Sequence, residues 1–197
     1  IIRDEIKKHA GKEALHYGQE IIGSFMTAEK AVSCALAIQE QLKGMPEEYF
    51  SVRIHAGEPV AKTDELFGDT LQLLNWLGIM KRKEAIVITP GIKELIAKDM
   101  QDKSKAQLFA LTIPDEQFLT SLFEEHKKNY THNDFNSDKY AQALVMSKSQ
   151  LYRRVTALTG YSPNDLLNEF RLKKAKELLR KMKYNISEVS FETGFSS

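Results

Sequence analysis

The feature that most constrains the fold is residues 147–160, a short segment that carries its own helix start and stop signals. Ser147 and Gln150 have the spacing of a capping box, in which each side chain bonds a free backbone N–H at the helix start. Gly160 stands where a helix commonly ends in a left-handed residue. The apolar residues between them fall on one narrow helical stripe: Leu151, Val155 and Leu158. This pattern predicts an amphipathic helix that packs on one side only.

The face opposite this stripe is polar and cationic, as a helix that enters the major groove of DNA would need. Four side chains are predicted to reach base edges: Ser149, Gln150, Tyr152 and Arg153. Arg and Gln can bond purine bases in bidentate fashion. Three more are predicted to meet phosphates and set the register: Ser147, Lys148 and Arg154. The alternative is an ordinary solvated surface helix, so the choice depends on the neighbouring sequence.

The sequence around this helix has the spacing of a helix-turn-helix unit. Ser137 is predicted to cap a helix over residues 138–144, and residues 145–147 then turn into the basic helix. Because Val145 is β-branched and disfavours a left-handed conformation, a turn of another type is expected. Further helices are predicted over 118–130, from Ser162-Pro163 to about Lys183, and from a capping box at 185–188.

Three runs in this region resemble the DNA-binding domain of the AraC family of transcription regulators. They are 149–164 (SQLYRRVTALTGYSPN), 171–179 (RLKKAKELL) and 186–197 (ISEVSFETGFSS). The resemblance covers residues 118–197 and implies two helix-turn-helix units joined by a long helix, with base contacts at the same four positions. The family's second reading helix would begin near Ser197. We therefore expect a fragment that lacks it and binds DNA more weakly and less specifically.

Charge is unevenly distributed along the chain. Residues 147–183 contain ten Lys and Arg against three acidic residues, a net charge of +7, whereas residues 1–146 carry −4. The whole chain is close to neutral, at +1. A basic segment within a nearly neutral protein is the electrostatic signature of phosphate binding. Double-stranded DNA is therefore the predicted partner.

The upstream part, residues 1–112, alternates helix and strand signals, which predicts an α+β domain followed by a linker over residues 113–117. The first expected elements are a helix ending at Gly11, a hairpin turning at Gly18-Gln19, and a helix over 27–42 that is capped by Thr27. They are followed by a strand over 50–57, a helix after Gly68, a strand over 85–89, a helix from Pro90 and a strand over 108–111.

Four segments of this part resemble the class III adenylate/guanylate cyclase catalytic domain: 11–19, 35–39, 52–58 and 66–77. The resemblance covers about residues 1–100. It implies a cyclase-like (ferredoxin-like) α+β domain ahead of an all-α helix-turn-helix domain. Because that family pairs its domains head to tail, the resemblance also implies a homodimer.

At the positions that carry the chemistry of the cyclase family, this chain lacks the family's functional side chains. The base-recognising Lys maps to Leu15, a metal-binding Asp to Gln19, and the transition-state Asn and Arg to Gln72 and Trp76. Gln lacks the anionic oxygen that a hard divalent ion prefers, and loss of an Arg beside developing phosphate charge is costly to the rate. A regulatory or dimerising domain that is not an enzyme is therefore predicted. A nucleotide or small-ligand sensor and a cyclase with altered chemistry remain the alternatives.

Composition limits the other function classes. No apolar run reaches the roughly 18 residues of a membrane span, so no membrane partner is expected. Cys34 is the only cysteine, which excludes a disulfide within one chain and favours the cytoplasm. The five His residues show no metal-ligand spacing. We predict no metal and no cofactor, and expect DNA, a second copy of the chain and an unidentified small-molecule effector as partners.

Overall fold

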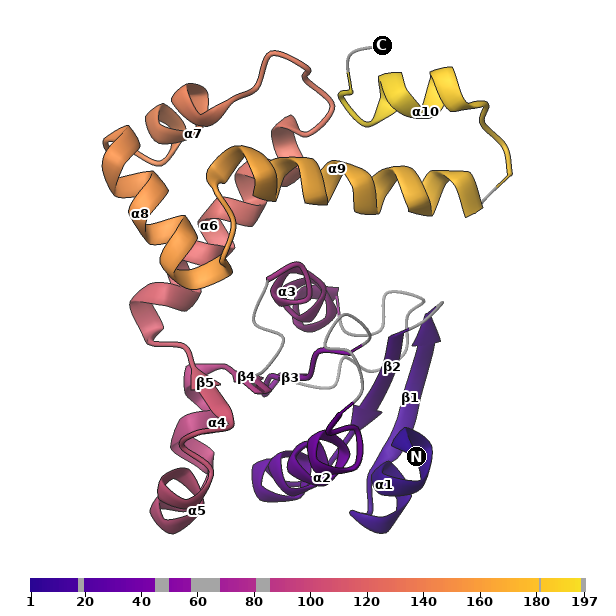
Figure 1. Cartoon of the computed structure of the whole chain (residues 1–197), viewed down its shortest axis with the longest axis vertical. Helices are drawn as coiled ribbons and strands as arrows, with labels where there is room; N and C mark the ends of the chain where they lie inside the picture. The colour runs from indigo at the N-terminus through magenta and orange to yellow at the C-terminus, as the bar shows by residue number, and fades with distance from the viewer. Residues whose placement is uncertain (18–19, 45–49, 58–67, 81–85, 181, 196–197) are drawn as a thin grey trace. The chain divides into compact units, whose positions relative to one another are not determined.

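A computed structural model describes residues 1–17, 20–44, 50–57, 68–80, 86–180 and 182–195 (Figure 1). The chain divides into two compact units. One combines Ile1–Gly78 with Arg82–Ile113, and the other combines Ile79–Lys81 with Pro114–Ser197. Buried hydrophobic side chains are found in both units, so each has a core of its own.

The first unit begins with α1 (Ile2–Lys8) and an antiparallel hairpin of β1 (Lys12–Tyr17) and β2 (Glu20–Ser24), which confirms the predicted helix and hairpin. Thr27 caps α2 (Ala28–Gln41) as predicted, because its side chain accepts the N–H of Lys30 at 3.3 Å. Four buried side chains join α1 to α2: Ile6, Cys34, Ile38 and Leu42. Burial raises the pKa of the Cys34 thiol to about 11, so this cysteine stays protonated and packs as an apolar group.

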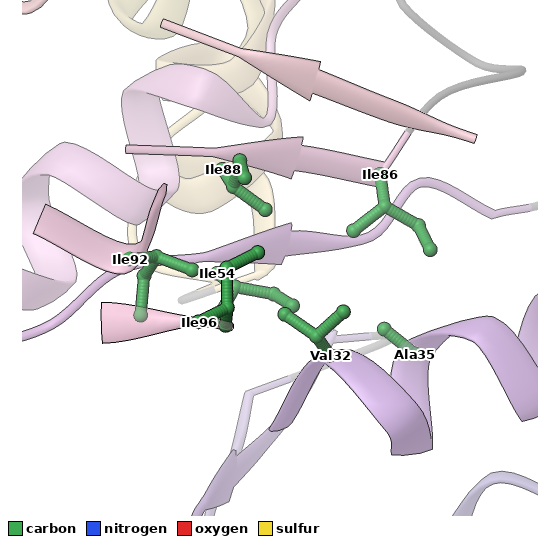
Figure 2. Close-up of a cluster of buried hydrophobic side chains, with 7 residues drawn as sticks. All are labelled: Val32, Ala35, Ile54, Ile86, Ile88, Ile92 and Ile96. Atoms are coloured by element: carbon green, nitrogen blue, oxygen red, sulfur yellow. The ribbon is translucent and has the colours of Figure 1, made fainter. Parts of the chain in front are cut away.

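Three parallel strands form a second sheet in the order β3 (Arg53–Ile54), β4 (Ile86–Ile88) and β5 (Leu108–Ala110). Side chains from α2, β3, β4 and the region of α4 (Pro90–Leu95) meet in one cluster, shown in Figure 2: Val32, Ala35, Ile54, Ile86, Ile88, Ile92 and Ile96. Burial of each isoleucine side chain contributes about 1.5–3 kcal/mol, so this cluster is the main core of the unit.

The strands agree only in part with the sequence. The strand predicted over residues 50–57 is reduced to β3, because only Arg53 and Ile54 pair with β4. A short helix, α5 (Lys98–Lys103), was not predicted. The α+β composition is confirmed, but among the described strands the hairpin and the parallel sheet are separate. The ferredoxin-like arrangement and the cyclase resemblance stay predictions.

α3 (Gly68–Leu77) contacts β3 through the half-buried side chain of Arg53. Arg53 Nη1 donates to Leu74 O at 3.2 Å, which places a cation at the helix C-terminus, where the helix dipole favours it. Gly78 permits this approach, because a Cβ there would lie 2.1 Å from the same nitrogen. Trp76, where the cyclase resemblance expects an Arg, is only 7% exposed, and Gln72 is half-buried. Gln19 and the side chain of Leu15 lie outside the described residues.

The described part of the second unit is helical and confirms the predicted all-α region. It contains α6 (Ile113–Asn129), α7 (Ser137–Ala143), α8 (Lys148–Thr159), α9 (Pro163–Arg180) and α10 (Ile186–Glu192) (Figure 1). Residues 113–117, expected to be a linker, instead form the first turn of α6. Pro114 has no N–H to lose in a first turn, and Asp115 and Glu116 favour the positive end of the helix dipole.

The core of the second unit contains a buried histidine among aromatic rings. His126 of α6 is fully buried, with its ring centroid 5.0 Å from that of Tyr140 and 5.3 Å from that of Phe170. Within the described residues, neither ring nitrogen has a hydrogen-bond partner. Burial, helped by the charge of Arg171, lowers the pKa of His126 to about 3. The imidazole is therefore neutral in the folded unit.

Arg171 of α9 forms hydrogen bonds with the backbone just after the end of α6. It is 6% exposed, and its Nε and Nη2 donate to Tyr130 O at 2.8 Å and His132 O at 2.6 Å. Gly194, just after α10, has φ +73°, and a Cβ there would lie 2.1 Å from the same Tyr130 O. The ends of α6 and α10 therefore meet α9 at this point. Among the described helices, none combines the length and the hydrophobicity needed to cross a membrane.

Candidate nucleic-acid interface

α7 and α8 are joined by a Schellman turn, whose two hydrogen bonds close the end of α7. The N–H of Val145 donates to Gln142 O at 3.1 Å, and the N–H of Met146 donates to Ala141 O at 3.0 Å. Val145 has φ +53° and is 92% exposed. The expectation of another turn type is therefore wrong. These two bonds require a left-handed residue, and the chain tolerates the strain of about 1–2 kcal/mol.

The start of α8 is held by the predicted capping box. Ser147 Oγ accepts the N–H of Gln150 at 3.2 Å and donates to its Oε1 at 3.0 Å. The N–H of Ser147 donates to the same Oε1, also at 3.0 Å. Gly160 ends the helix with φ +76°, which confirms the predicted stop. Because the cap uses Oε1 of Gln150, only the amide nitrogen of that side chain remains for a base.

The two faces of α8 are separated as the sequence indicated. Its buried residues include the predicted stripe and one more: Leu151, Val155, Leu158 and Thr159. All four residues predicted to contact bases are exposed: Ser149, Gln150, Tyr152 and Arg153. The aromatic ring among them, Tyr152, is 56% exposed although it is large and apolar in part. These side chains are available to a partner, and their contact with bases stays a prediction.

The three residues predicted to contact phosphates differ in their surroundings. Ser147 serves the cap. Lys148 is exposed, and its Nζ lies 2.6 Å from Asp138 Oδ1. Arg154 turns back onto α6, where its Nη2 donates to Pro114 O at 2.8 Å and its guanidinium lies 4.2 Å from the ring centroid of Phe118. Arg154 thus attaches α8 to the start of α6, and its contact with a phosphate remains a prediction only.

A shallow hollow opens beside the exposed face of α8. It is lined by residues of α7, α8 and the start of α9: Ser137, Lys148, Ser149, Tyr152, Ser162, Pro163 and Asn164. Asn164 Oδ1 accepts the N–H of Ser137 at 3.0 Å, which ties α9 to α7. Asn136 Oδ1 accepts the N–H groups of Asp138 and Lys139. The cap of α7 is therefore Asn136, and the prediction of Ser137 was wrong because the asparagine oxygen reaches both N–H groups.

Not every cation of the basic segment faces solvent. Arg171 is buried against backbone carbonyls, and Lys174 pairs with Glu177 at 2.9 Å. Several others are exposed in the described residues: Lys148, Arg153, Lys176, Arg180 and Lys183. The net charge of the segment therefore overstates the surface that could meet phosphates.

α10 begins with a capping box like that of α8 and ends in a Schellman turn like that of α7. Asn185 Oδ1 accepts the N–H of Glu188 at 2.9 Å, and Glu188 Oε2 accepts the N–H of Asn185 at 2.8 Å, which confirms the predicted capping box. A Schellman turn follows, with Gly194 N–H donating to Phe191 O and Phe195 N–H to Ser190 O. The same turn thus ends α7 and α10, with valine at the left-handed position of one and glycine at that of the other.

The sequence missed three residues that shape this surface: Asn136, Asp138 and Asn164. An Asn before a helix is a known cap signal, so Asn136 could have been found. The partners of Asp138 and Asn164 lie 10 and 27 residues away, beyond any local pattern. Within the described residues, no group of three or more His, Cys, Asp or Glu side chains is placed to hold a metal ion.

Two short helices joined by a tight turn, with polar and cationic side chains exposed on the second, define a helix-turn-helix domain. The family model described as "Helix-turn-helix domain" matches residues 140–197. The C-terminal part of the chain carries an AraC-type helix-turn-helix domain, as the sequence indicated.

Three similar proteins each match part of the chain. Histidine kinase P4 of Formosa agariphila is 36% identical over 83 residues, which are 42% of this chain and 6% of that protein. The HTH-type transcriptional regulator MtrA of Neisseria gonorrhoeae is 38% identical over 65 residues, 33% of this chain and 22% of that protein. The HTH-type transcriptional activator RhaS of Escherichia coli is 33% identical over 78 residues, 40% and 27% respectively. The chain spans less than a third of each of them. No solved structure matches the chain.

Proposed function

We propose that the protein is a sequence-specific, DNA-binding transcription regulator without catalytic activity, and that α8 reads the major groove of duplex DNA. The observation that carries this proposal is the division of α8 into a buried apolar stripe and an exposed polar face that contains Arg153. The likeness of the C-terminal part to proteins named as a transcriptional regulator and a transcriptional activator supports it.

Each exposed residue of α8 has a proposed role. Arg153 is the main base contact, because a guanidinium can bond O6 and N7 of guanine together. Ser149, Gln150 and Tyr152 lie on the same exposed face and add single contacts. Lys148 meets a phosphate as a point charge, and the N-cap Ser147 lies beside it. Arg154 contributes by holding α8 against α6 through Pro114 O.

The N-terminal unit is proposed to be a non-catalytic input and dimerisation domain, derived from a cyclase-like fold, over about residues 1–112. The burial of Trp76 supports the loss of the transition-state position, because an indole inside a core offers no charge to a phosphate. A homodimer and an unidentified small-molecule effector belong to this proposal. A DNA-binding regulator of this kind would act in the cytoplasm.

The test is DNA binding by the full chain, with sequences first selected from a random duplex library. Arg153→Ala should weaken binding to the selected sequence more than to random duplex, since it removes base contacts. Arg153→Lys is the matched control, because it keeps the charge but cannot make the bidentate contact. Lys148→Ala should weaken both duplexes alike. Equal losses on both duplexes for Arg153→Ala and Lys148→Ala would reject the assigned roles.

A further inference from the structure

The hollow between α7, α8 and the start of α9 has a single cation at its edge, and that cation is already paired. Lys148 Nζ lies 2.6 Å from Asp138 Oδ1, with the two side chains 67% and 52% exposed. We propose that this hollow receives one backbone phosphate of duplex DNA and that Asp138 competes with the phosphate for Lys148. The inference rests on the proposed DNA binding and adds a site and a built-in competitor to it.

The lining of the hollow suits a phosphodiester. The hydroxyl group of Ser137 can donate to a phosphate oxygen, and the hydroxyl groups of Ser149 and Tyr152 line the hollow on the side of α8 that is proposed to face the bases. Asn164 adds an amide. Its Oδ1 must face the N–H of Ser137, which it accepts at 3.0 Å, so its NH₂ group can donate to a second acceptor. Ser162 is engaged with Asp165 at 2.6 Å and keeps that carboxylate at the start of α9.

The ion pair between Lys148 and Asp138 can be exchanged for a phosphate. Exposed ion pairs contribute little to stability, since both charges are solvated and screened by salt. A phosphate that enters the hollow can therefore take over the ammonium group. The carboxylate of Asp138 then remains nearby without its partner and repels the phosphate. Asp138 thus holds the affinity for DNA below the value that the cations alone would give.

Asp138→Asn tests the competition in the full chain, with a labelled random-sequence duplex at several salt concentrations. We expect affinity to rise about two- to fivefold beyond the effect of net charge, the range set by a weak surface ion pair. Glu177→Gln is the charge-matched control, because it opens another ion pair of the basic segment, the half-buried pair Lys174–Glu177 on α9. In a Lys148→Gln background, Asp138→Asn should lose its extra effect.

Asn164→Asp tests the hollow itself. An aspartate can still accept the N–H of Ser137, so α7 and α9 stay tied while the hollow gains a negative charge. We expect weaker binding than that of Asn168→Asp, which adds the same charge at an exposed position of α9 outside the lining.

The outcomes separate the two proposals. If Asp138→Asn and Glu177→Gln raise affinity equally, or if the gain persists in the Lys148→Gln background, Asp138 is not a competitor. If Asn164→Asp and Asn168→Asp weaken binding equally, the hollow holds no phosphate. Both results leave DNA binding in place. If the unaltered chain binds no duplex at low salt, the proposed function fails and the phosphate site fails with it.

Discussion

The buried imidazole of His126 should make the second unit sensitive to acid. Its folded pKa is about 3, against an ordinary value of 6.5. The lowered pKa means that the unfolded chain takes up the proton more readily than the folded chain at any pH between these values. Stability is therefore complete above about pH 6.5, falls as the pH decreases below it, and levels off near pH 3.

The size of this loss follows from the distance between the two pKa values. One pKa unit corresponds to about 1.4 kcal/mol, so the step from pH 6.5 to pH 5 costs about 2 kcal/mol and the full span costs about 5 kcal/mol. The group is fully buried, so solvent does not screen this penalty. A loss of about 2 kcal/mol is a large part of the stability of a small domain.

The variant His126→Leu removes the titrating group and should abolish its share of the acid loss. At pH 8 the variant loses the ring contacts with Tyr140 and Phe170 but also removes two buried nitrogens without hydrogen-bond partners in the described residues. An unsatisfied buried polar group costs about 1–3 kcal/mol, so the net change at pH 8 should be small.

Hydrogen exchange measured by mass spectrometry on peptides of α6 and α9, at increasing urea, reports the free energy of unfolding of this unit. Fluorescence would not serve, because the single tryptophan, Trp76, belongs to the other unit. His132→Gln removes an exposed imidazole of the same unit and is the control. If wild type and His126→Leu lose equal stability between pH 8 and pH 5, the account of a neutral buried histidine is refuted.

Three further changes test the turns and the arginine of the helix-turn-helix unit. Gly194→Ala should destabilise the unit by about 2–4 kcal/mol in the same exchange experiment, because its Cβ meets a backbone carbonyl at a left-handed position; a change below about 1 kcal/mol would contradict this. Val145→Asn should stabilise it by about 0.5–1 kcal/mol by relieving strain at an exposed site, and a loss of stability would count against the strain. Arg154→Leu should lower the stability of the unit but leave the salt dependence of DNA binding unchanged. Lys148→Ala should reduce the slope of log binding constant against log salt concentration by about one. A reduced slope for Arg154→Leu would indicate that Arg154 contacts a phosphate.

Helix boundaries were the part of the fold that the sequence predicted best. The caps at Thr27, Ser147 and Asn185 were correct because both partners of each capping bond lie within three residues. Gly160 was correct for a similar reason, since a left-handed stop depends on one residue type. The exposed face of α8 followed directly, because a helix with a known start and a known apolar stripe has only one opposite face.

The sequence predicted least where a structure depends on contacts between residues distant in sequence, or on opposing local preferences of the backbone. The bond from Arg154 to Pro114 spans 40 residues, so no local pattern could indicate that this arginine faces the domain's own backbone, and its phosphate contact stays a prediction. At Val145 the steric preference of one residue was outweighed by two turn hydrogen bonds. Residues 113–117 were predicted to be a linker, whereas they form the first turn of α6, a position that proline fits.

The cap of α8 and its proposed base-reading surface compete for the side chain of Gln150. Bidentate recognition of adenine needs both the oxygen and the nitrogen of that amide, but the oxygen already accepts two bonds from Ser147 at 3.0 Å. Releasing it would cost roughly 1 kcal/mol of cap energy. With the cap intact, Gln150 can only donate, and guanine, adenine and thymine all offer acceptors in the major groove. In the proposed complex with DNA, we therefore expect discrimination between bases to depend mainly on Arg153, whose guanidinium can serve both acceptors of guanine while the helix stays capped.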